Sequence, residues 1–153
     1  MTKITLIRHC EAMGNYHRVF QGMTDAEISE NGKKQLELLS VRCRNMDFAA
    51  MYSSPLRRAY QTAQAANRYH QLPIIIEPGL VEINGGEWEG IPWADLPARY
   101  PRETEAWNTY PHAFQAPNGE SMQQVYDRIW NTVLSIARKE QGRHCLLYTS
   151  RCV

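Results

Sequence analysis

The sequence predicts an α/β fold of three layers (α/β/α), in which helices cover both faces of a largely parallel central sheet. Two observations predict this fold. Short apolar runs bounded by turn residues, typical of buried strands, alternate with longer segments whose apolar residues recur at helical spacing. Strands joined through helices pair in parallel, and both faces of a parallel sheet need covering. The chain of 153 residues has the length of a single domain, 1–153.

Four short apolar runs are predicted to form the sheet. The first, Ile4–Ile7, ends abruptly at Arg8 and His9. The run "FAAMYSS" ends in a Ser-Ser-Pro turn, "LPIIIEP" is closed by prolines, and "HCLLYTS" gives the last strand. The predicted strands cover residues 3–8, 48–54, 72–78 and 144–150.

Three segments have the spacing of amphipathic helices, and Ser29 is an N-cap residue for the first of them. The second has an inward stripe of small residues, so it should pack close to the sheet. The predicted helices cover residues 29–45, 56–70 and 120–140. Their inward faces carry Leu36, Leu39 and Cys43 in the first, Ala59, Thr62, Ala63 and Ala66 in the second, and Met122, Val125, Ile129, Val133 and Ile136 in the third.

Composition narrows the classes of function. The formal net charge of +1 gives no field that would attract nucleic acid or an anionic membrane, so neither is expected as a partner. No apolar stretch approaches the roughly 20 residues that span a bilayer, and the N-terminus lacks the features of a signal peptide. The cytoplasm is therefore the expected location. The cysteines show no metal spacing and are expected as free thiols, with Cys43 and Cys145 in the core and Cys10 as a small buried residue.

Three groups of polar residues fall where ligands bind open α/β sheets, at the carboxyl ends of strands. Arg8 and His9 follow the first strand. This pair suggests an anion-binding arginine beside a histidine that acts as nucleophile or proton carrier; the alternative is two surface residues that cap the strand. Arg57 and Arg58 open a helix directly after a strand, where free N–H groups favour anions, and a solvated helix start is the alternative for them. Glu82 precedes a Gly-Gly turn, where a solvated loop carboxylate is the alternative.

Five motifs in collinear order resemble the histidine phosphatase superfamily, the phosphoglycerate mutase-like group. "LIRHCEAMGN" is similar to the family's strand-Arg-His-Gly-Glu-x-x-x-Asn signature, and "SSPLRRAYQTA" to its Ser-x-Leu-x-Arg-Ala-x-x-Thr-Ala segment, with Arg58 as the matching arginine. "RVFQGMTDAEISENG", "LVEINGGEWEG" and "PNGES" follow the same pattern. The resemblance covers residues 3 to 149.

The resemblance implies a role for each matched residue. His9 would attack phosphorus and form a phosphohistidine, and Glu82 would protonate the leaving oxygen and later activate water. Arg8, Asn15 and Arg58 would bind the phosphoryl oxygens. The resemblance also places Gln21 and Gly22 on a loop near the substrate. Glu120 and Ser121 would lie at a helix start that also faces the pocket, with a purely structural Ser121 as the alternative. The resemblance implies no cofactor and no metal.

Two departures from the family pattern stand out. Cys10 replaces the family's Gly, a small change. More seriously, the resemblance implies a second catalytic His after the last strand, at Ser150 or Arg151, and neither residue is histidine. His144 lies at the opposite end of that strand. The family's C-terminal helix and strand are also missing, so the domain is expected to be incomplete at its C-terminus and poorly active or inactive.

The leading functional hypothesis is a phosphatase for a small phosphorylated metabolite. Phosphoglycerate mutase-type phosphoryl transfer is an alternative, which the short excursion between Glu82 and Glu120 disfavours. A non-catalytic phosphate-binding module is the second alternative, favoured by the absent His and disfavoured by Glu82. The irregular segment 79–119 carries aromatic residues that either shape a pocket for a ring-bearing leaving group or, as we favour, form a local core: Trp88, Trp93, Trp107, Tyr110 and Phe114. The sequence does not indicate the substrate or the oligomeric state.

Overall fold

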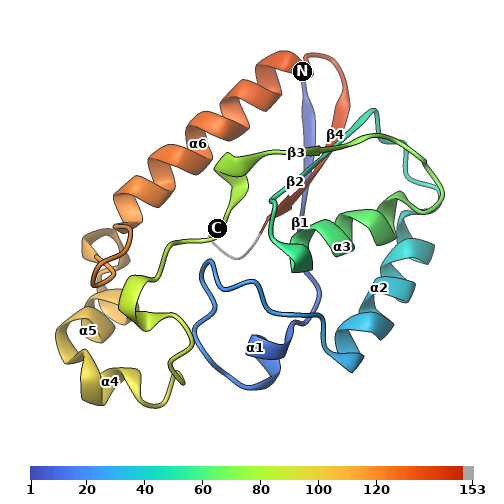
Figure 1. Cartoon of the computed structure of the whole chain (residues 1–153). Coiled ribbons are helices and arrows are strands. Elements are labelled where there is room, and N and C mark those ends of the chain that lie inside the picture. Colours follow the sequence, from blue (N-terminus) through green and yellow to red (C-terminus); the bar gives the residue numbers. More distant parts are fainter. Residues whose placement is uncertain (150–153) are drawn as a thin grey trace.

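The computed structural model describes residues 1–149, and these contain a four-stranded sheet with the order β1-β4-β2-β3 (Figure 1). Every pairing within this sheet is parallel, which confirms the predicted sheet type. Ser150 and Arg151, the positions discussed for a second histidine, lie outside the described residues. The strands are β1 (Lys3–Arg8), β2 (Ala50–Ser53), β3 (Ile74–Ile76) and β4 (His144–Thr149).

Strand β3 is shorter than the predicted 72–78. Pro73 and Pro78 flank it, and proline has no N–H to donate to the ladder. After β3, Glu77 donates its N–H to Ser53 O at 2.8 Å and its carboxylate caps the following turn at Gly79. The prolines that close this strand in the sequence therefore also exclude its first and last predicted residues from the sheet.

Three long helices accompany the sheet, at the three predicted places. These are α2 (Glu30–Cys43), α3 (Arg57–Asn67) and α6 (Met122–Lys139). As predicted, Ser29 caps α2 by accepting the N–H of Gly32 at 3.0 Å. The shorter helices are α1 (Met13–Tyr16), α4 (Leu96–Arg99) and α5 (Pro101–Thr109), with 3₁₀ turns η1 (Pro78–Leu80), η2 (Gly86–Trp88) and η3 (Pro111–Ala113).

Helix α3 ends three residues before the predicted end at residue 70. The Asn67 side chain donates to Leu72 O at 2.7 Å and accepts the Leu72 N–H at 2.9 Å. Gln71 between them has a φ of 54°, which no right-handed helix accommodates. An asparagine that binds the backbone five residues ahead thus turns the chain out of the helix and into β3.

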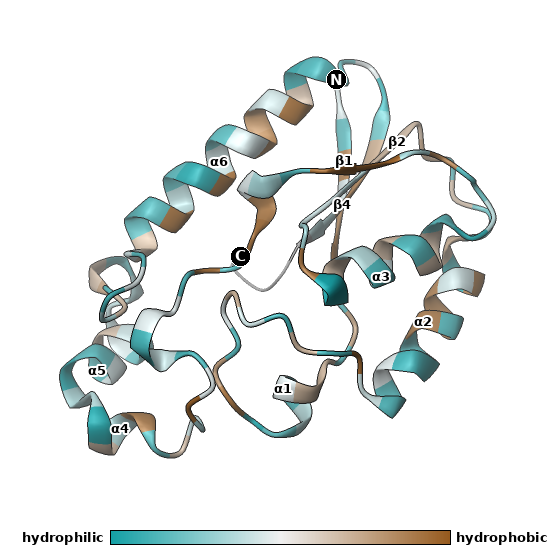
Figure 2. Cartoon of the chain, viewed as in Figure 1, coloured by the Kyte–Doolittle hydropathy of each residue, from teal (hydrophilic) through white to brown (hydrophobic). Residues whose placement is uncertain are grey.

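The central strand β4 is buried on both faces, which explains its apolar run without alternation. Leu146 and Tyr148 pack in one cluster with α2 and α3, while Cys145 and Leu147 pack in another with Ile136 of α6. The sheet therefore lies between α2 and α3 on one face and α6 on the other, the predicted three layers (Figure 1). Each of these helices alternates between hydrophilic and hydrophobic residues along its length, as amphipathic covering helices do (Figure 2).

The excursion between β3 and α6 builds a core of its own. Trp88 and Phe114 are fully buried there, with ring centroids 4.9 Å apart, and this confirms the local-core interpretation for both residues. Phe20, from the segment after α1, packs edge-on against Trp88 at 5.4 Å. This cluster ties the excursion to the segment that follows β1. Among the helices of residues 1–149, none has the length and apolar character needed to cross a bilayer.

Candidate active site

A cavity of about 760 Å³ opens beyond the carboxyl ends of β1, β2 and β3. This is where open parallel sheets bind their ligands, because loops and helix N-termini converge there. Arg8 is the last residue of β1, Arg58 lies in the first turn of α3 after β2, and Glu82 follows η1 after β3. Of the nine residues predicted to face the pocket, the structure brings seven to the wall of this cavity: Arg8, His9, Asn15, Gln21, Gly22, Arg58 and Glu82.

His9 is buried, with 9% of its surface exposed. Its Nδ1 lies 2.5 Å from the backbone carbonyl of Cys10. Because a carbonyl oxygen only accepts, Nδ1 carries the proton and Nε2 keeps its lone pair. The pKa of His9 is lowered to about 4, mainly by burial. The hydrogen bond to the Cys10 carbonyl raises the pKa, whereas the positive charges of Arg58 and Arg8 lower it. The imidazole is therefore neutral and nucleophilic near pH 7.

Cys10 anchors the turn beside His9 to α3. Its N–H donates to the Thr62 hydroxyl at 3.1 Å, and that hydroxyl donates to Arg58 O at 2.6 Å. The thiol is buried, and burial raises its pKa, so the sulfur stays protonated and inert near neutrality. Cys10 is thus the small buried residue that the sequence predicts.

Arg58 is a guanidinium with 1% of its surface exposed. It donates to Thr24 O and to Gly22 O, both at 2.7 Å, and within residues 1–149 it forms no ion pair. Burial lowers its pKa, while the carboxylates of Glu82, Asp25 and Glu89 raise it. Its Nε is buried and has no partner among the described residues. A buried cation with an unsatisfied N–H beside a cavity is suited to binding an anion.

The neighbouring Arg57 does not line the cavity. It is exposed, and its Nε donates to an Asp25 carboxylate oxygen at 3.2 Å, while the Arg57 backbone N–H donates to the other oxygen at 2.7 Å. Asp25 therefore caps the start of α3 and pairs with the arginine that the ligand site does not use. The structure thus separates the two arginines as the motif comparison predicts.

Glu82 is 8% exposed, and one of its carboxylate oxygens accepts the N–H of Ile83 at 3.0 Å. Among the described residues, no other hydrogen bond holds this carboxyl group. Asn15 also lines the cavity, and its Oδ1 accepts the Ala12 N–H at 3.0 Å, which leaves its Nδ2 to donate to a ligand. The cavity therefore offers a neutral imidazole, two guanidinium groups, an amide and a carboxyl group.

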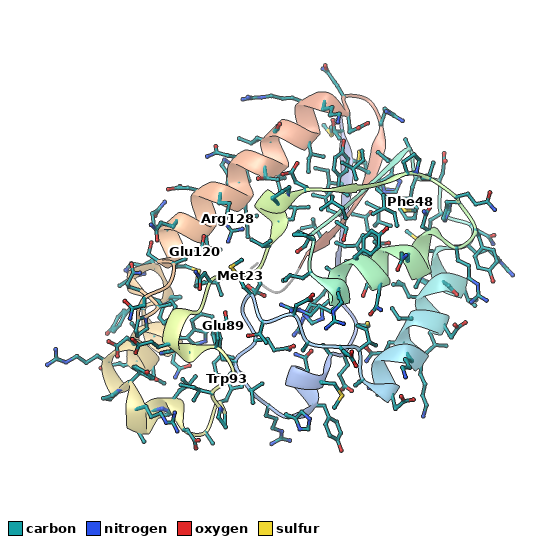
Figure 3. The ribbon with its side chains drawn as sticks, viewed as in Figure 1. Met23, Phe48, Glu89, Trp93, Glu120 and Arg128 are labelled. Atoms are coloured by element: carbon teal, nitrogen blue, oxygen red, sulfur yellow. The ribbon has the colours of Figure 1, made fainter. Side chains whose placement is uncertain are left out.

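Glu89 is a structural link that the sequence analysis missed. One carboxylate oxygen accepts the N–H groups of Met23 at 2.8 Å and Gly85 at 2.9 Å, and the other accepts both the N–H and the hydroxyl of Thr24 (Figure 3). Gly22, with a φ of 33°, makes this approach possible, because a Cβ there would lie 2.0 Å from Glu89 Oε1. Glu89 thus joins the loop that holds Arg58 to the turn after Glu82.

One expectation about the site is wrong. Glu120 does not line the cavity, because both its oxygens are bound by Arg128 and by the Asn84 N–H. Ser121 also lies outside the cavity and caps α6 in a reciprocal pair with Gln124, the structural alternative for this residue.

The remaining histidines of the chain lie elsewhere. His144 bonds the Thr5 hydroxyl at 2.9 Å, at the opposite end of β4 from His9, as expected. In the part of the chain that the structure describes, His9 alone among the histidines lines the cavity. No three His, Cys, Asp or Glu side chains in residues 1–149 gather in a way that could hold a metal ion.

The other aromatic residues of the excursion do not all follow one interpretation. Trp107 packs against the local core, whereas Tyr110 is exposed and belongs neither to that core nor to the described cavity wall. Trp93 keeps 41% of its surface exposed, and it lines the cavity together with Trp107. Trp93 also packs on Phe20, with 5.2 Å between ring centroids, so the cavity wall is continuous with the local core. Most of the remaining wall is apolar as well, with contributions from Val19, Ile83, Met122 and Ile129.

Fold and site together define an α/β protein with a cavity at the carboxyl edge of a parallel sheet, lined by a histidine, two arginines and a carboxyl group. Comparison with known proteins narrows this class. A sequence model described as "Histidine phosphatase superfamily (branch 1)" matches residues 4–153, and the chain belongs to that family. Family membership and the phosphatase names of relatives support the hydrolysis of phosphate esters.

Three known proteins illustrate the likeness. Phosphoserine phosphatase 1 of Hydrogenobacter thermophilus is 33% identical over 153 residues, which are 100% of this chain and 72% of the relative. The structure of Bacillus stearothermophilus YhfR superimposes with a TM-score of 0.92 at 30% identity, covering 97% of this chain and 74% of that one. A mycobacterial glucosyl-3-phosphoglycerate phosphatase in complex with VO3 gives a TM-score of 0.85 at 28% identity, over 95% and 74% of the two chains.

Proposed function

We propose that this protein hydrolyses phosphomonoesters of small phosphorylated metabolites through a phosphohistidine formed on His9. The observation that carries the proposal is the state of His9, whose Nε2 lone pair is free at neutral pH beside two arginines. A neutral imidazole is a nucleophile, and flanking guanidinium groups stabilise the charge that develops on phosphoryl oxygens. The relatives named as phosphatases support the same reaction class.

In the first step, Nε2 of His9 attacks phosphorus, the N–P bond forms and the bond to the leaving oxygen breaks. Arg8, Arg58 and Asn15 bind the non-bridging oxygens, and the buried unpartnered Nε of Arg58 supplies one of these bonds. Glu82, in its protonated form, passes its proton to the leaving oxygen. The products of this step are an alcohol and a phosphohistidine.

In the second step, a water molecule attacks the phosphohistidine. The Glu82 carboxylate removes a proton from that water, the N–P bond breaks and inorganic phosphate leaves. The electron pair of the N–P bond returns to Nε2, and Glu82 is protonated again for the next cycle. His9 is likewise regenerated in its starting state, with its Nδ1 proton still held by Cys10 O.

The wall of the cavity favours leaving groups with an apolar or ring-bearing surface. Trp93 and Trp107 offer aromatic faces beside the phosphoryl-binding groups. Arg8 and Arg58, the arginines that line the described part of the cavity, are both assigned to the phosphoryl group. Aryl phosphates are therefore the preferred test substrates.

A non-catalytic phosphate-binding module is the second candidate function. It is favoured by the absence of a second histidine among the described residues that line the cavity. Phosphoryl transfer of the phosphoglycerate mutase type is the third, and the short segment between Glu82 and Glu120 disfavours it. Binding and turnover must be measured separately to distinguish a module from an enzyme.

The test uses the 153-residue chain with p-nitrophenyl phosphate as substrate and vanadate as a phosphoryl analogue. We expect slow phosphate release that His9→Asn abolishes and that Arg58→Met lowers at least tenfold. Arg57→Met is the matched control, since Arg57 adjoins Arg58 but pairs with Asp25, and it should keep the rate. Vanadate binding without any phosphate release above the His9→Asn variant would overturn hydrolysis in favour of the binding module.

A further inference from the structure

Arg128 and Glu120 form an ion pair beside the segment that carries Glu82. Arg128, in the second turn of α6, donates from Nε to Glu120 Oε1 at 3.1 Å and from Nη2 to Glu120 Oε2 at 2.9 Å (Figure 3). Both side chains are about three-quarters buried. This bidentate geometry fixes the plane of the guanidinium.

The rest of the Arg128 guanidinium holds the backbone that leads to Glu82. Nη1 donates to Gly79 O at 3.0 Å and to Val81 O at 2.8 Å, and Nη2 makes a longer contact of 3.4 Å with Glu82 O. All five N–H groups of the guanidinium therefore have acceptors. Three of these acceptors are carbonyls within four consecutive residues.

Glu120 binds the backbone on the C-terminal side of Glu82. Its Oε2 accepts the Asn84 N–H at 2.8 Å, and its own N–H donates to Asn84 O at 2.9 Å. The pair thus holds the backbone before, at and after Glu82. By contrast, within residues 1–149 the Glu82 carboxyl group accepts a hydrogen bond only from Ile83, so its position depends on the backbone that carries it.

We propose that Arg128, oriented by Glu120, is a positioning residue that sets where the Glu82 carboxyl group meets the leaving oxygen. This inference rests on the proposed function, because it gives Arg128 a role only if Glu82 transfers a proton. Lysine cannot replace Arg128, since a single ammonium does not present the planar five-donor array that reaches Glu120 and three carbonyls.

The test compares two leaving groups of different basicity. p-Nitrophenol leaves readily without a proton, whereas an alkyl alcohol needs one, so a misplaced general acid slows alkyl phosphates selectively. The readout is kcat/KM, which reports formation of the phosphohistidine and not its later hydrolysis, the step in which Glu82 acts on water for every substrate. We expect Arg128→Met and Arg128→Lys to lower kcat/KM for an alkyl phosphate by about 10- to 100-fold, a fraction of the full general-acid effect. The kcat/KM for p-nitrophenyl phosphate should fall by less than about threefold on the same grounds.

Two controls separate positioning from folding. Arg138→Met changes an exposed arginine of the same helix and should leave both substrates unaffected. In the background of Glu82→Gln, Arg128→Met should cause no further loss on the alkyl phosphate, because the group that it positions is already disabled. Glu120→Gln serves as a milder variant, with the same selective loss expected.

Equal losses on both substrates, or an additional loss in the double variant, would overturn the positioning role and leave Arg128 as a structural residue. That result is distinct from failure of the proposed function. In the latter case the unaltered chain itself would release no more phosphate from p-nitrophenyl phosphate than His9→Asn does.

Discussion

The buried neutral His9 should make the stability of this protein depend on pH in a way that a single substitution removes. The native pKa of His9 is about 4, whereas an exposed histidine titrates at 6.5. Between these values the unfolded chain binds a proton that the native protein does not. Stability is therefore lost as the pH falls from about 6.5 to about 4, and no more is lost to this group below that range. From pH 7 to pH 5 the loss amounts to about 2 kcal/mol.

The measurement is urea unfolding of the chain and of His9→Asn at pH 7 and pH 5, followed by tryptophan fluorescence. Asparagine keeps a donor near Nδ1 for the Cys10 carbonyl but does not titrate. We expect the variant to lose about 2 kcal/mol less than the unaltered chain between the two pH values. The exposed His17 is the control, and His17→Asn should retain the full pH dependence. Identical pH dependence of the chain and His9→Asn would refute the buried neutral state.

Three further predictions follow from the same geometry. The kcat/KM for p-nitrophenyl phosphate should fall on acidification with an apparent pKa near 4, since protonation of His9 removes the nucleophile; a limb near 6.5 would contradict this. Trp93→Ala should lower kcat/KM for aryl phosphates by about 3- to 10-fold, as expected from the loss of one aromatic face, and leave kcat/KM for alkyl phosphates unchanged. Equal losses of kcat/KM on both substrate classes would contradict a role of Trp93 in the pocket. Trp88→Ala should lower the free energy of unfolding by about 3–5 kcal/mol in a urea titration, because Trp88 is fully buried at the centre of the aromatic cluster; a loss below 1 kcal/mol would contradict that role.

The order and type of the main elements could be predicted because their signals are local. Ser29 is recognisable as an N-cap because its side chain accepts the backbone N–H three residues ahead, at Gly32. The unbroken apolar run of β4 reflects the burial of this strand on both faces of the sheet. The boundaries were less predictable where distant or unusual contacts decide them. Asn67 ends α3 through its bonds to Leu72, and proline shortens β3, so both predicted elements were too long.

The candidate site could be predicted where its residues belong to local sequence motifs. His9, Arg58 and Glu82 belong to contiguous motifs and also lie at strand ends, so sequence and topology agree on them. Arg128 and Glu89 were missed because they act on backbone atoms of segments about 40 to 70 residues away. No local pattern marks such a contact, and the same pairing with Arg128 occupies the carboxylate of Glu120, which does not line the cavity.

The most direct test of the proposed chemistry is to trap the phosphoenzyme. The 153-residue chain is mixed with a ³²P-labelled aryl phosphate, quenched in alkali to preserve phosphohistidine, digested, and mapped by mass spectrometry. The proposal predicts label on the peptide that contains His9 and no label in His9→Asn. Phosphate release without label on His9, or label that persists in His9→Asn, would contradict the covalent mechanism.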